Sequence, residues 1–279
     1  MKLVHTQKAL QKELDKQKHA KHTIGFVPTM GALHQGHLSL INIAGKQSDY
    51  VVVSIFVNPT QFNNKEDLDK YPRNLEHDLK LLEKTPCDLV FAPSVNEMYP
   101  EKDIRKFDFG NLETVMEGKH RPGHFNGVAQ IVSKLFDATM PDKAFFGLKD
   151  FQQLAIIRQM TIQFNYGIEI VACETVREDD GLAMSSRNKR LTQPQRESAP
   201  LIAKTLNEAK NKITNHNIND IKQWVLSTID ADPNLETEYF EIVDEETLQP
   251  VTTWDESVNK IGCIAVNCGE VRLIDNIKF

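Results

Sequence analysis

The stretch that decides the fold is Ile24-Gly25-Phe26-Val27-Pro28-Thr29-Met30-Gly31-Ala32-Leu33-His34-Gln35-Gly36-His37. It opens with an apolar run, and Leu38, Leu40, Ile41 and Ile43 follow it at helical spacing. The pattern predicts a strand, a tight turn and a helix. Because the first N–H groups of a helix have no partner and its dipole is positive there, such a turn is a favourable place for an anion.

His34 and His37 stand at the start of that predicted helix. A glycine between them lets the backbone approach phosphate closely, and imidazoles can donate to oxygens that gain charge in a transition state. A His-x-Gly-His at this place is typical of nucleotidyl transfer at the α-phosphate of a nucleotide. Two alternatives remain: a pair of surface or capping histidines, and a metal site. Zinc needs three or four ligands and no cysteine or carboxylate is close in sequence, so metal ranks below phosphate.

The composition argues against two classes of protein, those that bind nucleic acid broadly and those that span a membrane. The chain has 279 residues and a formal net charge of −6, which argues against broad nucleic-acid binding. Its N-terminus is charged, and no stretch approaches the roughly 20 apolar residues of a membrane span. We therefore expect a cytoplasmic protein with neither a nucleic-acid nor a membrane partner. The four cysteines lack zinc or disulfide spacing and are predicted to be reduced and mostly buried.

Apolar runs alternate with helical patterns along the first 175 residues. This alternation predicts an α/β fold, a parallel sheet covered on both faces. The predicted strands are 23–27, 50–57, 88–92, 143–146 and 168–173; helical stripes are centred on Leu10 and Leu14, on Leu75 to Leu82, and on Val128 to Phe136. The polar, proline-containing segment 58–72 is predicted to be a loop at the carboxyl edge of the sheet, where ligands bind in such folds.

After residue 175 the pattern changes, which predicts a second, smaller α+β domain. The expected domains are 1–175 and 176–279, joined near 175–178. The second is predicted to contain helices at 194–213 and 218–229 and strands at 239–243, 262–267 and 271–274.

Four further segments could carry chemistry. Asn58 and Gln61 offer amide groups after a strand, Gln61 being the stronger candidate because Asn-Pro-Thr is also a common turn. His124 lies in the stretch 121–127, which could form a second helix start favourable to an anion, although a Gly- and Pro-rich linker is the favoured interpretation. The segment 146–153 repeats the strand–turn–helix pattern, with Lys149 as a mobile charge for phosphate. The segment 184–188 joins two hydroxyls to a guanidinium; a helix cap is a plausible role for one serine but explains the combination poorly.

Taken together, these motifs resemble the pantoate–β-alanine ligase family. The resemblance rests on 28–37, on Asn58-Pro59-Thr60-Gln61-Phe62, on Tyr71-Pro72-Arg73, and on the blocks 147–153 and 182–188, and it extends to 273–276. It implies a Rossmann-like domain followed by a smaller lid domain, a homodimer, and use of ATP with Mg²⁺. It also implies the joining of pantoate to β-alanine through pantoyl adenylate, with release of AMP and pyrophosphate.

The resemblance also implies roles for single residues. His37 would be the proton donor, His34 and Lys149 would contact phosphate, Gln61 would hold pantoate and later β-alanine, and Gln153 would hold pantoate, with Asn58 assisting Gln61. The ATP site would comprise Met30, Gly31, Ala32, Leu33, His34, Gln35, Gly36, His37, Gly147, Leu148, Lys149, Asp150, Val176, Met184, Ser185, Ser186 and Arg187.

The sequence does not assign the metal ligands. Asp78 and Asp150 are candidates for magnesium, although exposed helix carboxylates are usually only solvated. Asn126 and Leu148 depart from the residues expected in the family at those positions. The alternatives in function are an adenylyltransferase that leaves AMP on its product, a nucleotide-binding regulator that has lost catalysis, and a tRNA-charging enzyme. The acidic chain makes the last one the least favoured.

Overall fold

The computed structural model describes residues 1–279 and divides into two units. Unit 1 comprises Met1–Phe109, Arg121–Leu148 and Gln153–Glu174. Unit 2 comprises Gly110–His120, Lys149–Gln152 and Thr175–Phe279. No helix combines the length and the hydropathy that crossing a bilayer requires.

Unit 1 is built on a parallel sheet of six strands in the order β1-β4-β3-β2-β5-β6. The prediction of a Rossmann-like parallel sheet is confirmed, and each of its five predicted strands is present. The short β1 was missed because three residues are too few to show a period. The strands are β1 (Lys2–Val4), β2 (Ile24–Thr29), β3 (Tyr50–Ile55), β4 (Leu89–Phe91), β5 (Lys143–Gly147) and β6 (Glu169–Cys173).

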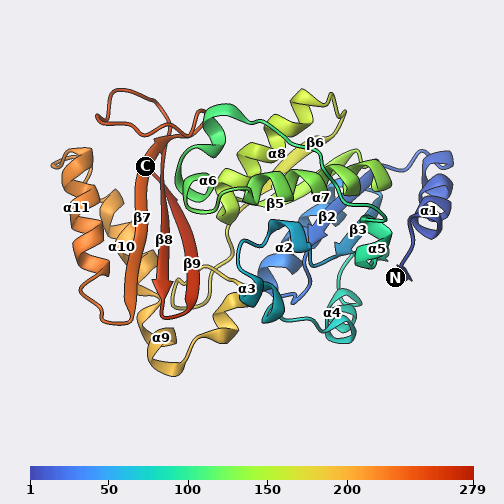
Figure 1. The fold of residues 1–279 in the computed structure, drawn as a ribbon, viewed down its shortest axis with the longest axis horizontal. Coiled ribbons are helices and arrows are strands. Elements are labelled where there is room, and N and C mark those ends of the chain that lie inside the picture. Colours follow the sequence, from blue (N-terminus) through green and yellow to red (C-terminus); the bar gives the residue numbers. More distant parts are fainter. The chain divides into compact units, whose positions relative to one another are not determined.

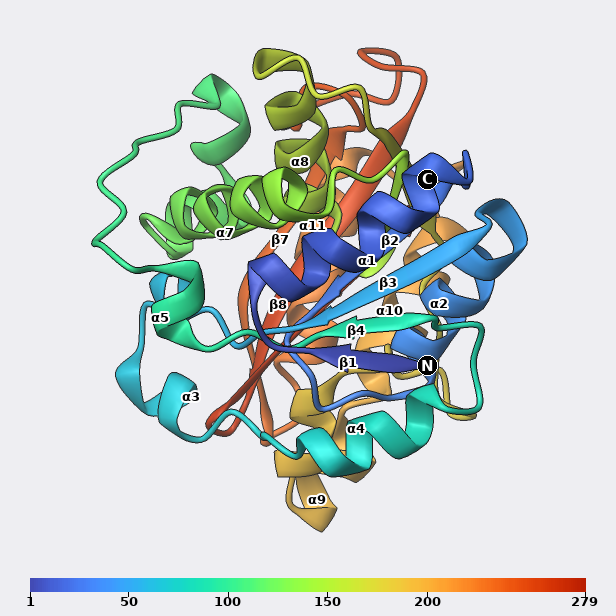
Figure 2. The same cartoon turned by 90° about the vertical axis from the view of Figure 1, so that its right-hand side faces the viewer.

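Helices cover both faces of this sheet (Figure 2). On one face lie α1 (Gln7–His19) and α7 (His124–Thr139); on the other lie α2 (Gln35–Gln47) and α4 (Leu75–Leu82). A hydrophobic cluster fills the space between α2, α4 and the strands and includes Val27, Ile41 and Leu82. Burial of this kind on both faces explains why the strands read as continuous apolar runs.

The strand order places a topological switch between β2 and β5. From β2 the chain proceeds through β3 to β4 on one side, and it later returns to add β5 on the other side of β2. Such a switch opens a crevice at the carboxyl ends of the two strands, where ligands bind in open α/β sheets. The histidine turn directly follows β2, so it lies at this carboxyl edge of the sheet.

Unit 2 contains an antiparallel sheet, β7 (Leu235–Asp244), β8 (Lys260–Cys268) and β9 (Val271–Lys278) (Figure 1). Two helices, α10 (Leu201–Lys210) and α11 (Ile218–Ile229), pack their apolar stripes against one face of it. The smaller α+β fold is thus confirmed. The single helix expected over 194–213 is wrong: α9 (Gln193–Ser198) ends before Pro200, which lacks the N–H that a continuous helix needs.

Two expected irregular segments contain helices. Within 58–72 lie the 3₁₀ turn η1 (Pro59–Gln61) and α3 (Lys65–Asp69), begun by the caps Asn58 and Asn64, so the loop prediction is only partly correct. The linker interpretation of 121–127 is wrong, because α7 already begins at His124 behind Gly123, which has a φ of 81°. The remaining short elements are α5 (Val95–Met98), η2 (Gly110–Glu113), α6 (Met116–His120), η3 (Leu148–Asp150), α8 (Phe151–Gln163) and η4 (Ser186–Arg190).

Candidate active site

The turn between β2 and α2 has a backbone that few residues tolerate. Gly31 and Ala32 both have positive φ, 75° and 50°. A Cβ on Gly31 would lie 2.9 Å from Asp78 Oδ2 and 3.1 Å from Ile55 Cγ2. Glycine is therefore required at position 31, both because the backbone there has a positive φ and because there is no space for a side chain. Thr29 Oγ1 closes the start of the turn, donating to Ser54 O and accepting from Gly31 N.

Asp78, on α4, stabilises this turn through hydrogen bonds to its backbone. Its two carboxylate oxygens accept from Ala32 N at 2.9 Å and Leu33 N at 2.8 Å, and the residue is 1% exposed. Asp78 is therefore not the exposed helix carboxylate that the sequence suggested. Its charge compensates two backbone N–H groups that would otherwise be buried without partners.

The two histidines form a reciprocal cap at the start of α2. His34 Nδ1 accepts from Gly36 N at 3.2 Å, and His37 Nδ1 accepts from His34 N at 3.3 Å. The ring centroids are 4.0 Å apart. Because Nδ1 of each ring is an acceptor, the proton of each neutral imidazole lies on Nε2. The capping alternative is thus correct for Nδ1, while Nε2–H gives each ring a donor of the kind that phosphate oxygens accept.

Gln61 and Asn58 follow β3 at the same edge of the sheet. Asn58 is 1% exposed, and its Nδ2 donates to Gln61 Oε1 and to Gly127 O, both at 3.0 Å. Its Oδ1 accepts from the Tyr99 hydroxyl at 2.8 Å. Gln61 Nε2 donates to the thioether of Met30 at 3.3 Å, a weak acceptor. Gln61 is half-buried and lies close to a residue of the β2 turn, as the sequence predicted for a site at this edge.

The start of α7 packs closely on η1. A Cβ on Gly127 would lie 2.3 Å from Thr60 O, so only glycine permits the approach. His124 is buried, and its Nδ1 lies 2.9 Å from Gln61 O, which fixes the backbone that carries the Gln61 side chain. Asn126 accepts from Phe107 N at 2.9 Å through Oδ1. These contacts involve residues distant in sequence, so residue spacing gave no signal of them.

The motif after β5 is divided between the units. Gly147 ends β5 and Leu148 begins η3, both in unit 1. Lys149 and Asp150 belong to unit 2, and Gln153, on α8, belongs to unit 1 again. The Lys149 side chain is 18% exposed, and its Nζ lies 3.9 Å from Asp150 Oδ1. The strand–turn–helix pattern predicted for this block is confirmed.

The unit 2 part of this motif is held by two side chains that the sequence did not single out. Gln152 is 4% exposed, accepts from Glu117 N and donates to the carbonyls of Leu112 and Val115. Asn276, on β9, donates to Lys149 O at 3.1 Å. Lys149 is thereby attached by its backbone to the C-terminal sheet.

The hydroxyl segment of unit 2 begins the 3₁₀ turn η4. Ser185 is its N-cap and accepts from Arg187 N at 3.2 Å, so the cap interpretation is correct for this serine. Ser186 is buried and Arg187 is half-buried. Met184 N donates to Val176 O at 3.0 Å, which joins two of the residues predicted for ATP.

An ion pair connects this segment to β9. Arg177 Nη1 and Nη2 donate to the two carboxylate oxygens of Asp275, at 2.6 and 3.0 Å, and Nη1 also donates to Gly181 O. Asp275 is 5% exposed. Hydrogen bonding to the Asp275 carboxylate raises the pKa of Arg177 above its ordinary value. Since β9 also packs on η4, one strand supports both Lys149 and the Ser185 segment.

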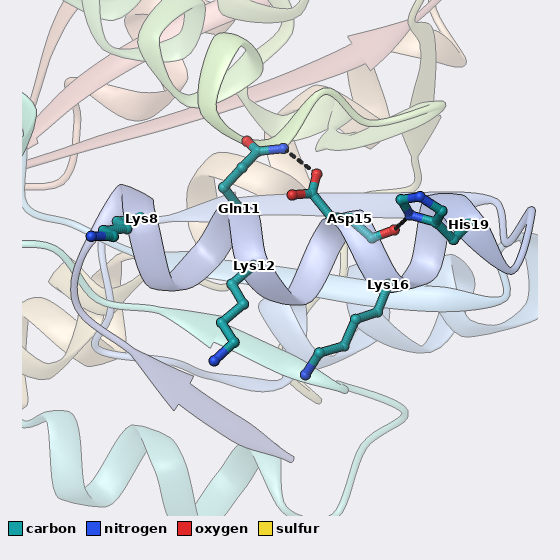
Figure 3. A pocket seen from close by; sticks show the side chains of 6 residues that line it. All are labelled: Lys8, Gln11, Lys12, Asp15, Lys16 and His19. Carbon is teal, nitrogen blue, oxygen red and sulfur yellow. Dashed lines mark hydrogen bonds between the residues drawn. The ribbon is translucent and has the colours of Figure 1, made fainter.

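No group of three or more His, Cys, Asp or Glu side chains is arranged to hold a metal ion. A shallow hollow does occur on α1, lined by Lys8, Lys12, Lys16, Gln11, Asp15 and His19 (Figure 3). Lys12 and Lys16 extend to the same side of the helix, and Gln11 donates to Asp15 Oδ1. It contains none of the residues predicted for substrate.

Comparison with known proteins gives consistent matches over the full chain. A family model described as pantoate-beta-alanine ligase matches residues 2–278. The chain is 56% identical over 279 residues to a pantothenate synthetase of Bacteroides thetaiotaomicron, covering 100% of this chain and 99% of that one. It is 57% identical over 280 residues to a pantothenate synthetase of Phocaeicola vulgatus, with the same coverage.

Solved structures agree with these matches. A pantothenate synthetase from Thermus thermophilus superposes with a TM-score of 0.93 at 40% identity, covering 99% of each chain. A pantoate-beta-alanine ligase from Francisella tularensis, complexed with beta-gamma ATP and beta-alanine, superposes with a TM-score of 0.83 at 34% identity. That match covers 99% of this chain and 97% of the other.

Proposed function

The chain belongs to the pantoate–β-alanine ligase family, and we propose that it joins pantoate to β-alanine in an ATP-dependent, AMP-forming reaction. The observation that carries the proposal is the β2–α2 turn, where the rings of His34 and His37 carry Nε2–H donors at a helix N-terminus. The Francisella relative, which is complexed with beta-gamma ATP and beta-alanine, supports the same substrates for this chain.

The reaction has two half-reactions. First, a carboxylate oxygen of pantoate attacks the α-phosphorus of ATP, the bond from that phosphorus to the bridging oxygen breaks, and pyrophosphate leaves. Second, the amine of β-alanine attacks the acyl carbon of pantoyl adenylate, and AMP leaves with the electrons of the acyl–oxygen bond. Neither step requires a covalent bond to the protein, so catalysis is mainly positioning and stabilisation of charge.

In this proposal, His34 and His37 donate through Nε2–H to phosphate oxygens as negative charge grows on them. Neutral imidazole donors suit this role near pH 7, because the ordinary histidine pKa is about 6.5. Gln61 binds oxygens of pantoate and then of β-alanine, and Gln153 binds pantoate. Asn58, with its amide engaged inside the protein, acts on substrate only through Gln61.

Unit 2 contributes the remaining groups predicted for ATP: Val176, Met184, Ser185, Ser186, Arg187, Lys149 and Asp150. Lysine offers a mobile point charge and arginine a fixed fork, which are complementary ways to hold a triphosphate. Excluding water from the mixed anhydride is the role proposed for the smaller domain, 176–279, as a lid over the first domain, 1–175.

Magnesium is proposed to enter with ATP. Mg²⁺ keeps several waters and is usually held by substrate phosphates with one or two carboxylates. Asp78 does not fit as its ligand, because both its oxygens accept backbone N–H groups. Asp150, whose side chain is 48% exposed, has a carboxylate accessible to such an ion. The ion would offset phosphate charge.

The test of this function is exchange of labelled pyrophosphate into ATP, with magnesium and pantoate and without β-alanine. Pantoate-dependent exchange is expected, since the first half-reaction is reversible. Adding β-alanine should then release AMP, an outcome that an enzyme leaving AMP on its product would not give. No exchange in folded, ATP-binding protein would contradict the proposal. A homodimer and a cytoplasmic location stay predictions from the resemblance.

A further inference from the structure

The side chains of Tyr99, Asn58 and Gln61 form a chain of hydrogen bonds that has a direction. The direction is set by Gly127 O, a carbonyl oxygen that can only accept from Asn58 Nδ2, and the Tyr99 hydroxyl adds to it by donating to Asn58 Oδ1 at 2.8 Å. Burial raises the pKa of Tyr99, so the phenol keeps its proton at neutral pH. With Oδ1 of Asn58 facing Tyr99, its NH₂ group faces away from Tyr99. Both N–H groups of that NH₂ then donate, one to Gly127 O and one to Gln61 Oε1.

The direction of the Asn58 amide determines that of Gln61. Because Gln61 Oε1 accepts from Asn58 Nδ2, the Gln61 NH₂ points the other way, toward the Met30 thioether. Sulfur is a weak acceptor that a ligand oxygen readily replaces. Gln61 in this orientation offers donors to a ligand, which suits a carboxylate or a hydroxyl lone pair. The opposite orientation would offer a carbonyl oxygen, which a carboxylate repels.

Tyr99 is itself held in place by charged neighbours. Lys134 Nζ lies 5.2 Å from the centroid of its ring, and the same Nζ is 3.5 Å from Asp103 Oδ2. Thr60 adds a second hydroxyl, 3.1 Å from Asn58 Oδ1 and 3.3 Å from the Tyr99 oxygen. The Lys134 contact therefore holds the Tyr99 ring independently of the hydrogen bond from its hydroxyl to Asn58.

We propose that Tyr99 is a positioning residue for the acid substrate: together with Gly127 O it holds the Asn58 amide, and through it the Gln61 amide, so that N–H donors rather than a carbonyl oxygen face an oxygen of pantoate. The inference rests on the proposed function and names a residue outside the motifs that indicated it. Tyr99 lies 38 residues beyond Gln61 in the chain. In this proposal it acts on pantoate only through Asn58 and Gln61.

The test compares Tyr99→Phe with Tyr166→Phe in the pyrophosphate exchange assay. Each variant removes one phenol hydroxyl from a 2.8 Å hydrogen bond in unit 1; that of Tyr166 donates to Asp137 Oδ1, outside the site. A phenylalanine at 99 keeps the ring that Lys134 covers. The half-saturating pantoate concentration should rise about five-fold in Tyr99→Phe, the effect of one ordinary hydrogen bond. That for ATP should be unchanged, and Tyr166→Phe should match the wild type in both.

Gln61→Glu provides the second variant. It keeps an acceptor for Asn58 but replaces the NH₂ by an oxygen, so pantoate-dependent exchange should fall much further than in Tyr99→Phe while ATP still binds. Equal pantoate dependence in Tyr99→Phe and the wild type would overturn the inference alone. A Gln61→Glu enzyme that binds pantoate normally would overturn both the inference and the role proposed above for Gln61. No pantoate-dependent exchange in the wild type would instead overturn the proposed function.

Discussion

Replacing Asp78 by asparagine tests whether the histidine turn depends on a carboxylate below it. Two charge-assisted hydrogen bonds, to Ala32 N and Leu33 N, contribute roughly 2 kcal/mol each. Asparagine keeps one neutral bond of about 1 kcal/mol, and its NH₂ then faces the other N–H. The free energy of unfolding should therefore fall by about 3 kcal/mol. A turn displaced by about 1 Å would also slow pyrophosphate exchange about 100-fold.

Asp142→Asn is the matched control. Asp142 Oδ2 accepts from Ile24 N at 2.7 Å, at the opposite end of the same strand β2, and asparagine can still accept there. Its expected cost is about 1 kcal/mol with no change in exchange rate. Urea unfolding followed by circular dichroism measures both variants. Trp224 and Trp254 both lie in unit 2. Tryptophan fluorescence therefore monitors unfolding of unit 2, whereas both substitutions lie in unit 1. Equal stability and equal exchange in both variants would refute the reasoning.

Four further substitutions have stated expected outcomes. His37→Ala and Lys149→Ala should fold normally and slow pyrophosphate exchange by about 100-fold, the usual cost of a donor to a charged transition state, and unchanged exchange in both would contradict their roles. Asn276→Ala removes the hydrogen bond to Lys149 O, so the ATP concentration for half-maximal exchange should rise several-fold while that for pantoate stays constant. Asp103→Asn should lower the free energy of unfolding by about 1 kcal/mol at pH 7. Because the Arg105 guanidinium lowers the pKa of Asp103 to about 2, this difference should persist above the unfolded value near 3.8 and vanish as pH falls through about 2; chemical unfolding across that range would measure it.

The apolar pattern was sufficient for five of the six strands of the central sheet. Strands such as β2 and β3 are buried on both faces, so each appears in the sequence as a short apolar run between polar segments. The His34 turn was equally accessible, because its glycines and histidines are adjacent in the chain. What the pattern could not predict was where helices stop and start: Pro200 divides α9 from α10, and Gly123 starts α7 earlier than its apolar stripe suggests.

The supporting residues of the site were not predictable in the same way. Asp78 lies 46 residues from Ala32, and Tyr99 lies 41 residues from Asn58. An aspartate on an amphipathic helix and a tyrosine after a short helix have many ordinary explanations. Only the tertiary contacts show that one carboxylate is buried under a turn and that one phenol orients an amide.

The two adjacent glutamines of α8 show that a sequence motif can indicate chemistry without indicating which structural unit each of its residues joins. Gln152 is buried and uses its amide on the backbone of 112–117, so it belongs with unit 2; Gln153 is half-buried and belongs with unit 1. The segment that Gln152 binds is fixed in turn by Glu117, which accepts from Arg272 on β9 at 2.6 and 2.9 Å. Residues near 117 and 150 therefore join the C-terminal sheet although they precede it in the chain. Lys149 shares that attachment through Asn276, so the cation expected to contact phosphate is carried by the same strand that supports Ser185 and Arg187.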